Sequence, residues 1–450
     1  MLSKGGRAKA KFGLARQGGR RRTRQNVRQG DTGRIENITD GTGIGEDALQ
    51  TPARLLLSHR DFLLFIATRA GNVFGVQMLS IAVGWHIYKI TGSVLFLGLV
   101  GLFQFLPVLV LFLAAGMAAD RLDRRLIIAA CNVLHAVAAT LIGAYLLFGP
   151  VSVWPVFGFL ALHGCARAFL QPASHSILPN IVPRELFSNA VAISSSMNKF
   201  GQLAGPAIGG ILIALVGQWT YLIIALLFGL AAAAAAMIQT RLAVRDRESF
   251  GLKTMLGGFD YIWRKKIILG AVSIDLVAVL FGGILGMLPV YAIDILQVGP
   301  EALGAMRAMP GAGALIVALI LAQIRVTSHM GAAFFISLSI FGIAIVVFSL
   351  STMFWLSLVA LAVYGAADMV SVYIRQTLVQ IETPDELRGR VSAVNSVSIN
   401  ASNELGDFRA GIMAAAIGIV PAVLVGGIVT LAVTALWWKL FPDLRKVDRI

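Results

Sequence analysis

The sequence predicts an all-α integral membrane protein with twelve transmembrane helices in two six-helix halves. Of the 450 residues, 57% are hydrophobic and 14% are charged, whereas a soluble domain carries roughly 25% charged residues. The apolar residues form runs of membrane-spanning length from Phe62 to Phe441, and the two halves of this region repeat. These observations exclude a soluble enzyme.

Twelve apolar segments result when these runs are divided at charge clusters and at Gly/Pro turns. A helix needs about 20 apolar residues to cross the hydrocarbon core of a bilayer. The predicted spans are residues 62–88, 94–118, 126–148, 152–172, 188–216, 219–239, 267–292, 302–322, 332–350, 354–380, 391–416 and 420–440. Because their number is even, we expect both termini on one side.

The basic residues of the loops set the orientation, since Lys and Arg accumulate in short cytoplasmic loops. The loops after even-numbered spans are basic, whereas Lys89 is the only basic residue in the loops after odd-numbered spans. We therefore expect a multi-pass protein of a bacterial inner membrane with both termini in the cytoplasm. Its surroundings are the lipid bilayer.

The chain divides at polar segments into four parts. They are a disordered basic cytoplasmic tail (1–53), an N-terminal half (54–239), a cytoplasmic linker (240–266) and a C-terminal half with a short cytoplasmic tail (267–450). Ten basic residues and no acidic one lie in residues 1–30, so this tail is too polar to fold. The topology places it at the membrane surface, where anionic lipid is the expected partner and nucleic acid is disfavoured.

An internal repeat supports the two halves. Residues 182–186 (VPREL) precede one polar helix, and residues 383–387 (TPDEL) precede another 201 residues later. At that offset Ala192, Ser195, Gly205 and Gly210 correspond to Ala393, Ser396, Gly406 and Gly411. Repeated halves with a site between them are typical of secondary transporters.

Two motifs carry a resemblance to the major facilitator superfamily. Residues 116–125 (GMAADRLDRR) resemble its loop motif between spans 2 and 3, with Asp123 where the superfamily usually has Gly. Residues 201–210 (GQLAGPAIGG) match its antiporter motif GxxxGPxxGG. The segments AVGW (82–85), LGLV (97–100), QFLP (104–107) and DELRGR (385–390) further resemble the enterobactin exporter branch.

The resemblance implies the major facilitator fold and a function. It implies a monomeric secondary transporter, not an enzyme, that exports a small amphipathic molecule such as a siderophore in exchange for protons by alternating access. Broad-specificity multidrug efflux and a non-transporting receptor or scaffold are the alternatives. We expect no cofactor and no metal, with the proton gradient as the energy source, because the sequence has no phosphate-binding GxxxxGK[ST] loop and no metal-ligand spacing.

Charged residues inside the spans are candidate functional residues, since each costs about 2.5–3.5 kcal/mol at a helix centre even on the mildest scale. They are Arg69, Arg167, Lys199, Asp275, Arg307, Asp368, Arg375, Glu404, Asp407 and Arg409. Spans 3, 6 and 9 have none in their interiors, and the resemblance makes spans 3, 6, 9 and 12 lipid-facing supports. Six of the ten charges are basic, which suits an anionic substrate.

Four acidic residues are candidates for proton coupling. Glu404 and Asp407 are three residues apart and share a helix face, so they would not both ionise readily and could carry a proton. The alternative is that Lys199, Arg69 or Arg409 holds each acid in a purely structural ion pair. Asp275 and Asp368 are single acids near mid-depth.

The remaining candidates are basic or structural. Arg69, Arg167 and Lys199 are cavity and substrate candidates, whereas Arg307 and Arg375 are expected to extend to the membrane interface. Asp120, Arg121 and Arg124 are the gate candidates, since a carboxylate at the end of span 2 could meet the N-terminus of another helix. The resemblance implies that this partner is span 11 and that the contact exists only when the cytoplasmic side is closed. His135 and His163 are expected to be packing residues. The antiporter motif predicts a hinge at Gly201, Gly205, Pro206, Gly209 and Gly210.

Overall fold

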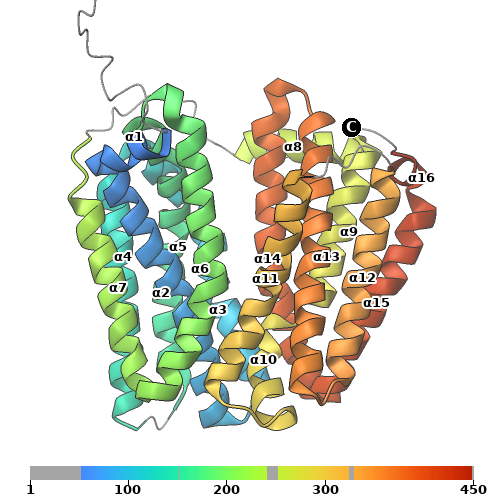
Figure 1. The fold of residues 1–450 in the computed structure, drawn as a ribbon, viewed down its shortest axis with the longest axis horizontal. Helices are drawn as coiled ribbons and strands as arrows, with labels where there is room; N and C mark the ends of the chain where they lie inside the picture. Colours follow the sequence, from blue (N-terminus) through green and yellow to red (C-terminus); the bar gives the residue numbers. More distant parts are fainter. Residues whose placement is uncertain (1–51, 150–151, 241–251, 324–328, 448–450) are drawn as a thin grey trace, which may run out of the picture. The chain divides into compact units, whose positions relative to one another are not determined.

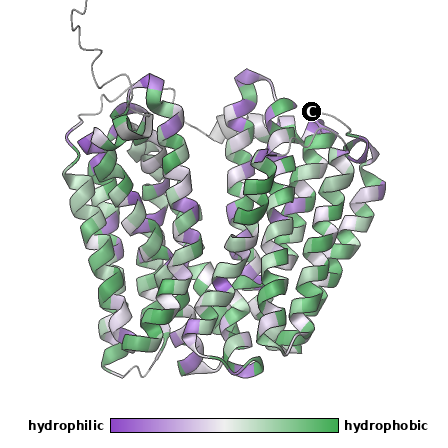
Figure 2. Ribbon diagram, in the orientation of Figure 1, coloured by the Kyte–Doolittle hydropathy of each residue, from purple (hydrophilic) through white to green (hydrophobic). Residues whose placement is uncertain are grey.

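The computed structural model describes residues 52–149, 152–240, 252–323 and 329–447, and residues 50–450 form one compact unit. Within the described ranges the chain is helical and has no β-strand (Figure 1). The predicted tail lies almost entirely outside them, and the described chain begins with α1 (Pro52–Ser58). Hydrophobic residues dominate the long helices (Figure 2).

Six long helices form the described N-terminal half. They are α2 (Arg60–Thr91), α3 (Val94–Arg121), α4 (Arg124–Leu147), α5 (Trp154–Ile181), α6 (Phe187–Val216) and α7 (Thr220–Ala236), with the 3₁₀ turns η2 (Arg184–Leu186) and η3 (Gly217–Trp219) before the last two. The predicted end of span 4 at residue 172 is wrong. The helix continues through Pro172 and Pro179, because neighbouring groups in a membrane protein can satisfy the backbone carbonyls that a proline leaves free.

The C-terminal half begins with an interrupted span. Its helix α9 (Lys266–Gly282) is followed by η4 (Leu285–Met287), α10 (Leu288–Val290) and the π-helical turn η5 (Tyr291–Ile295). The predicted span over residues 267–292 is present, because residues 266–295 are long and apolar enough to cross a membrane, but its helix is interrupted. Gly283 is extended, with φ −62° and ψ 111°, and glycines weaken a helix because they lose more backbone entropy than other residues on folding.

Regular helices complete the described C-terminal half. They are α11 (Pro300–Gln323), α12 (Met330–Leu350), α13 (Phe354–Ile381), α14 (Asp385–Ile417), α15 (Ile419–Leu440) and the short α16 (Pro442–Arg445). The predicted linker contains a further helix, α8 (Leu252–Arg264), while residues 241–251 lie outside the described ranges. This helix is held to the C-terminal half, since the Tyr261 hydroxyl donates to the Glu382 carbonyl at 2.6 Å.

Nine stretches of the described helices are long and apolar enough to cross a membrane. One of them, residues 184–236, contains both α6 and α7, and α5 and α14 fall outside the set. Polar residues interrupt these two, namely Arg167 in α5 and Glu404, Asp407 and Arg409 in α14. With these helices included, the described chain contains the twelve predicted spans, and the fold class is confirmed.

Among the described residues, the apolar core joins the two halves at one end only. We call the end where α2 begins the terminal end, and the end where α2 ends the distal end. A single cluster of buried side chains reaches across both halves toward the distal end, including Met78, Tyr88, Leu97, Ile213, Met287, Leu303 and Ala414. Toward the terminal end each described half has clusters of its own, around Phe62 and Ile177 in one and around Phe334 and Ile374 in the other.

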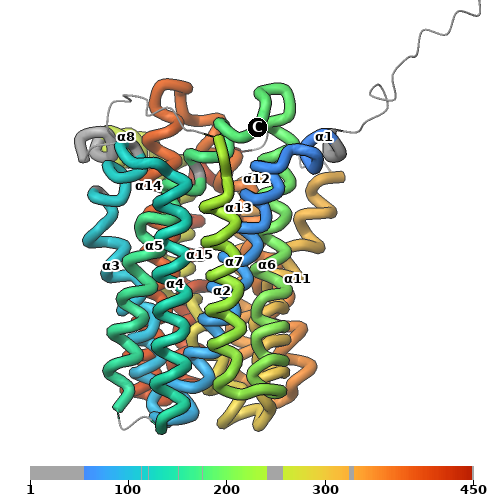
Figure 3. The backbone as a smooth tube through the Cα atoms, turned by 90° about the vertical axis from the view of Figure 1, so that its left-hand side faces the viewer, coloured from blue at the N-terminus to red at the C-terminus, as the bar shows by residue number. Residues whose placement is uncertain are grey.

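Glycines form the two seams between the halves, where α6 packs on α11 and α3 packs on α14. A Cβ on Gly210 would lie 2.9 Å from the Cα of Gly304, and a Cβ on Gly411 would lie 2.7 Å from the Cα of Gly98. Small residues let helix backbones approach closely in membranes. Figures 1 and 3 show α6 beside α11.

The predicted repeat is visible in where its glycines lie. Gly210 and Gly411 occupy the two seams. A Cβ on Gly205 would lie 2.8 Å from the Cβ of Gln77 in α2, and a Cβ on Gly406 would lie 3.0 Å from the Val279 carbonyl oxygen in α9. Since α2 and α9 are the first spans of their halves, residues 201 apart occupy equivalent places.

We expect Gly209→Ala to destabilise the protein by about 1–3 kcal/mol. Its Cβ would lie 2.8 Å from Ile81 Cγ2 and 3.1 Å from Met78 Cα, so α6 would have to move away from α2. Thermal unfolding of the detergent-purified protein measures the effect. Gly229→Ala is the matched control, because its Cβ would meet nothing within 4 Å. A Tm of Gly209→Ala no lower than that of the control would contradict the close packing.

Candidate functional site

An ion pair in the interior links the two halves. Arg167 in α5 and Glu404 in α14 are joined by a hydrogen-bonded contact of 2.8 Å between Nη1 and Oε1. Their side chains are 36% and 16% exposed, and each lies near the middle of its helix. Two opposite charges in direct contact beside low-dielectric protein attract each other more strongly than in bulk water. This pair is therefore a specific attraction across the halves.

Asp407 lies one turn further along α14 and is hydrogen-bonded to the backbone of the interrupted span. Its Oδ1 accepts a hydrogen bond from the backbone N–H of Gly286 in η4 at 3.2 Å. A Cβ on Gly286 would lie 2.8 Å from the Asp407 carboxyl carbon, so a side chain at this position would have to displace the carboxylate. The helix break thus supplies a free N–H to a carboxylate inside the membrane region, as discontinuous helices do in other transporters.

The prediction that Glu404 and Asp407 share a face is confirmed. Both lie against Gly101 of α3, where an added Cβ would be 3.4 Å from Glu404 Oε2 and 3.7 Å from Asp407 Cβ. The basic partner of Glu404 is Arg167, which was not among the partners considered for it. Arg409 turns away from Glu404 and donates to the Phe281 carbonyl at 2.7 Å.

Arg307 is a third basic group near these carboxylates, and its charge interacts with Glu404 and Asp407. Its Nη1 donates to the Leu285 carbonyl at 3.0 Å, and its Nη2 donates to the Ser80 hydroxyl at 2.9 Å. The expectation that Arg307 extends to the interface is wrong, because these bonds hold it between α11, η4 and α2.

A second ion pair lies within the C-terminal half. Arg375 is 1% exposed, and its Nη2 lies 3.2 Å from Asp275 Oδ2. Its Nη1 donates to Asn395 Oδ1 at 2.8 Å. Arg375 therefore does not extend to the interface, and Asp275 has a buried basic partner. The pair joins α13 to α9, and Asn395 adds α14.

Two further candidates have no bonded partner in the described chain. Asp368 is half-buried and forms no hydrogen bond or ion pair with a described residue, although its charge interacts with those of Asp275, Arg375 and Lys199. Lys199 is exposed on α6 and likewise forms no such bond to the described residues. The structure does not bring these two into the Arg167–Glu404 pair.

A polar cavity of about 320 Å³ lies within the N-terminal half, and we call it the N-half cavity. Helices α2, α4, α5 and α6 line it, with Arg69, Asn72, Asn132, His135, Arg167 and Gln171 among the polar side chains. The structure thus brings the candidates Arg69 and Arg167 to one site. It also places polar residues of α4, the third span, at that site, which the support role of this span did not predict.

Several groups at the N-half cavity lack partners within the described residues. The Nε of Arg69 is buried without a hydrogen bond, as are both ring nitrogens of His135. His135 and His163 are 0% and 1% exposed, with ring centroids 4.2 Å apart. Both are buried as packing residues, but ring nitrogens of both lack a partner among the described residues, contrary to the expectation of satisfied histidines. His135 also lines a cavity, which its isolated position in the sequence could not indicate.

The predicted gate is only partly described, since the side chain of Asp120 lies outside the described part. Arg121 is exposed, and Arg124 donates to the carbonyls of Ala119 and Ser176, each at 3.0 Å. Asp123 caps α4 by accepting from the Arg125 backbone N–H at 3.1 Å. Its φ of −64° is ordinary, so the Asp in place of Gly causes no strain.

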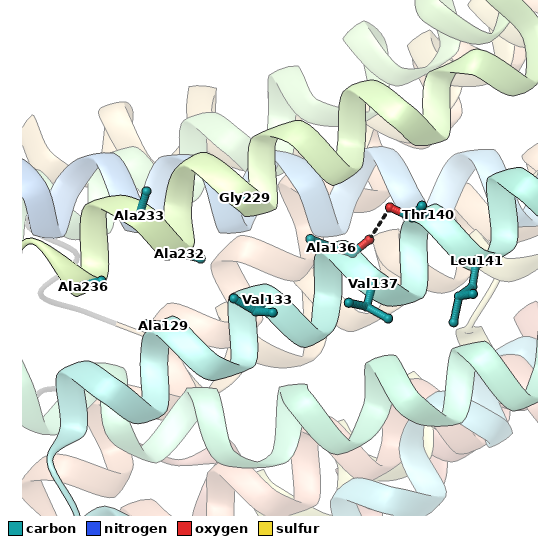
Figure 4. A pocket seen from close by; sticks show the side chains of 10 residues that line it. All are labelled: Ala129, Val133, Ala136, Val137, Thr140, Leu141, Gly229, Ala232, Ala233 and Ala236. Atoms are coloured by element: carbon teal, nitrogen blue, oxygen red, sulfur yellow. Dashed lines mark hydrogen bonds between the residues drawn. The ribbon is translucent and has the colours of Figure 1, made fainter.

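An apolar groove of about 590 Å³ lies between α4 and α7 (Figure 4). Its lining consists of Ala129, Val133, Ala136, Val137, Thr140, Leu141, Gly229, Ala232, Ala233 and Ala236. The one hydroxyl, that of Thr140, donates to the Ala136 carbonyl at 2.9 Å. The groove therefore offers a ligand no free polar group, and its surface suits lipid chains.

Comparisons with known proteins match this chain to membrane transporters. The family model described as transmembrane secretion effector matches residues 57–449. The enterobactin exporter EntS of Shigella boydii is 26% identical over 361 residues, which cover 76% of this chain and 82% of that protein. Macrolide efflux protein A of Streptococcus pyogenes is 22% identical over 400 residues, covering 86% and 97%.

Solved structures show the same fold. A bacterial homologue of the human lysosomal transporter Spinster, in an inward-facing and unoccupied conformation, matches with a TM-score of 0.66 at 15% identity and covers 87% of this chain and 99% of that one. A POT family transporter in complex with 5-aminolevulinic acid matches with a TM-score of 0.64 at 12% identity, covering 86% and 97%.

We expect Asp275→Asn to destabilise the protein by about 3–5 kcal/mol, because it removes the carboxylate that is paired directly with the buried Arg375. The double variant Asp275→Leu, Arg375→Met removes both charges and should recover most of that loss. Denaturant unfolding followed by tryptophan fluorescence measures both. If the double variant were no more stable than Asp275→Asn, the ion pair would not be the source of the effect.

Proposed function

This chain belongs to the major facilitator superfamily of membrane transporters, and we propose that it is a proton-coupled exporter of small amphipathic molecules that works by alternating access. The family and the relatives identify an efflux-type transporter rather than an enzyme. The outward direction, the coupled proton and the substrate belong to the proposal.

The observation that carries the proposal is the ion pair between Arg167 and Glu404. It joins one half to the other near the middle of both helices, where alternating access requires the halves to move against each other. Protonation of Glu404 would remove one charge and weaken this attraction. Asp407, one turn away, is the second carboxylate at which the same site would accept a proton.

The orientation of the proposed cycle follows from the loop charges. We place the terminal end in the cytoplasm because the basic loops lie there, with both termini, in a bacterial inner membrane. The described core joins the halves at the distal end and is divided at the terminal end, so this arrangement is the inward-facing state. We expect Asp120, Arg121 and Arg124 to act as the gate when the terminal end closes, with the antiporter-motif glycines of α6 as the hinge.

Two substrate classes are supported by different observations. The six basic and four acidic groups of the interior favour an anionic amphipathic substrate of the siderophore kind, and a relative named for enterobactin export agrees with this choice. Broad-specificity multidrug efflux is the second candidate, because the macrolide efflux relative aligns over 97% of its length.

We expect Glu404→Gln and Asp407→Asn each to abolish acceleration of export by a pH gradient, while substrate binding remains. Neither amide accepts a proton to become neutral, so the proton cannot drive the cycle. Flux into proteoliposomes with and without the gradient measures this. Asp260→Asn is the control, because that carboxylate is 60% exposed on α8. Unchanged proton-driven flux in both interior variants would refute the assignment.

The substrate class is tested with inside-out vesicles that contain the protein. We expect a catecholate siderophore to give saturable uptake driven by a pH gradient, with little competition from a macrolide or a cationic dye. The physical reason is the excess of basic side chains in the interior. Saturable transport of the dye or the macrolide, without transport of the catecholate, would replace this choice with multidrug efflux.

A further inference from the structure

Two arginines line the N-half cavity, and only one of them has a counter-charge in the described chain. Arg167 already has a counter-charge, Glu404, at 2.8 Å. Arg69 has none, because it forms no ion pair or hydrogen bond with any described residue and its Nε is buried. An ionised group held among membrane helices without a partner is unfavourable. Within the described chain, the Arg69 guanidinium therefore lacks a negative group that would neutralise it.

The rest of the lining supplies hydrogen-bond donors. His135 is fully buried and neither of its ring nitrogens is bonded to a described residue, and a neutral imidazole carries one N–H. Asn132, whose Nδ2 donates to the Ile128 carbonyl at 2.8 Å, accepts from Asn72 Nδ2 through its side-chain oxygen at 3.0 Å. Arg69 and one ring N–H of His135 are therefore donors at this cavity that no described residue uses.

The volume limits what can enter. About 320 Å³ is at the lower end of the roughly 300–1,000 Å³ typical of small-molecule sites. It suits a single ring that bears an oxyanion, and it is too small for a large molecule as a whole. A larger substrate would place one acidic arm in this cavity.

We propose that the N-half cavity binds an oxyanion of the substrate, a carboxylate or a phenolate on one ring, between Arg69 and Arg167. The proposal rests on the proposed transport function and names its substrate class. It has a second part: the oxyanion competes with Glu404 for the Arg167 guanidinium. Substrate entry then releases Glu404 from its ion pair, and the freed carboxylate accepts the proton.

The charged surroundings of Glu404 agree with this exchange. Arg167 faces it from α5 and Arg307 interacts with it from α11. Asp407 lies beside it on α14, Arg409 is turned toward Phe281, and the uncharged Gly101 of α3 packs against both carboxylates. When the substrate oxyanion binds Arg167, Glu404 loses its hydrogen-bonded cation. The negative charge of Asp407 remains one turn away on α14. The loss of this cation is the change that lets the carboxylate accept a proton.

The test measures binding of sodium benzoate to the purified full-length protein by its effect on Tm, with sodium chloride at equal ionic strength as the baseline. We expect a saturable rise in Tm with benzoate and none with benzamide, its neutral analogue. Arg69→Gln should weaken benzoate binding about tenfold or more, and Arg69→Lys should retain most of it. Arg264→Gln, which removes an exposed arginine of α8, should leave it unchanged.

Glu404→Gln separates this proposal from a simple basic pocket. If Glu404 competes for Arg167, the glutamine variant should bind benzoate several-fold more tightly than the unmodified protein, whereas Arg167→Gln should bind it more weakly. Equal stabilisation by benzamide, or full benzoate binding in Arg69→Gln, would overturn the oxyanion site. Unchanged affinity in Glu404→Gln would overturn the competition.

Failure here is distinguishable from failure of the proposed function. Binding is measured in detergent without a gradient, and flux is measured in proteoliposomes. Proton-driven flux of a cationic dye without benzoate binding would remove the oxyanion site and leave the exporter. Benzoate binding without any proton-driven flux would leave the site and remove proton coupling.

Discussion

A charged side chain inside a bilayer must be neutralised by a partner or a ligand, and this constraint organises the interior of the protein. Asp275 and Arg375 satisfy it within one half, at 3.2 Å and almost without exposure. Arg167 and Glu404 satisfy it across the halves, so their pairing depends on the conformation. An interior charge pair within a half stabilises that half, whereas one between halves can respond to protons and substrate.

Backbone features make this charge arrangement possible. The interruption after Gly282 frees the Gly286 N–H for Asp407, which an unbroken helix would have used internally. The seams at Gly98 and Gly411 and at Gly210 bring the halves into backbone contact at the distal end only. The same glycines therefore hold the halves together where the core is continuous and leave the terminal end of the described chain divided.

Much of the candidate site could be predicted as a list of residues but not as a set of contacts. The three-residue spacing of Glu404 and Asp407 placed both on one face of a helix, and they do share it. The predictions for Arg307 and Arg375 failed, because distance from a span end says nothing about which carbonyl or carboxylate a neighbouring helix supplies. His135 was assigned to packing because it stands alone in the sequence, although it also lines a cavity.

The sequence by itself determined the twelve spans, the repeat and the superfamily motifs, because hydropathy, helical periodicity and small-residue spacing are local properties of the chain. Tertiary structure decided which charges meet, where the seventh span breaks and that Arg69 is left without a partner beside Arg167. These depend on residues up to 237 positions apart, as Arg167 and Glu404 are. Their proximity follows from how helices pack, which the pattern along any one helix does not contain.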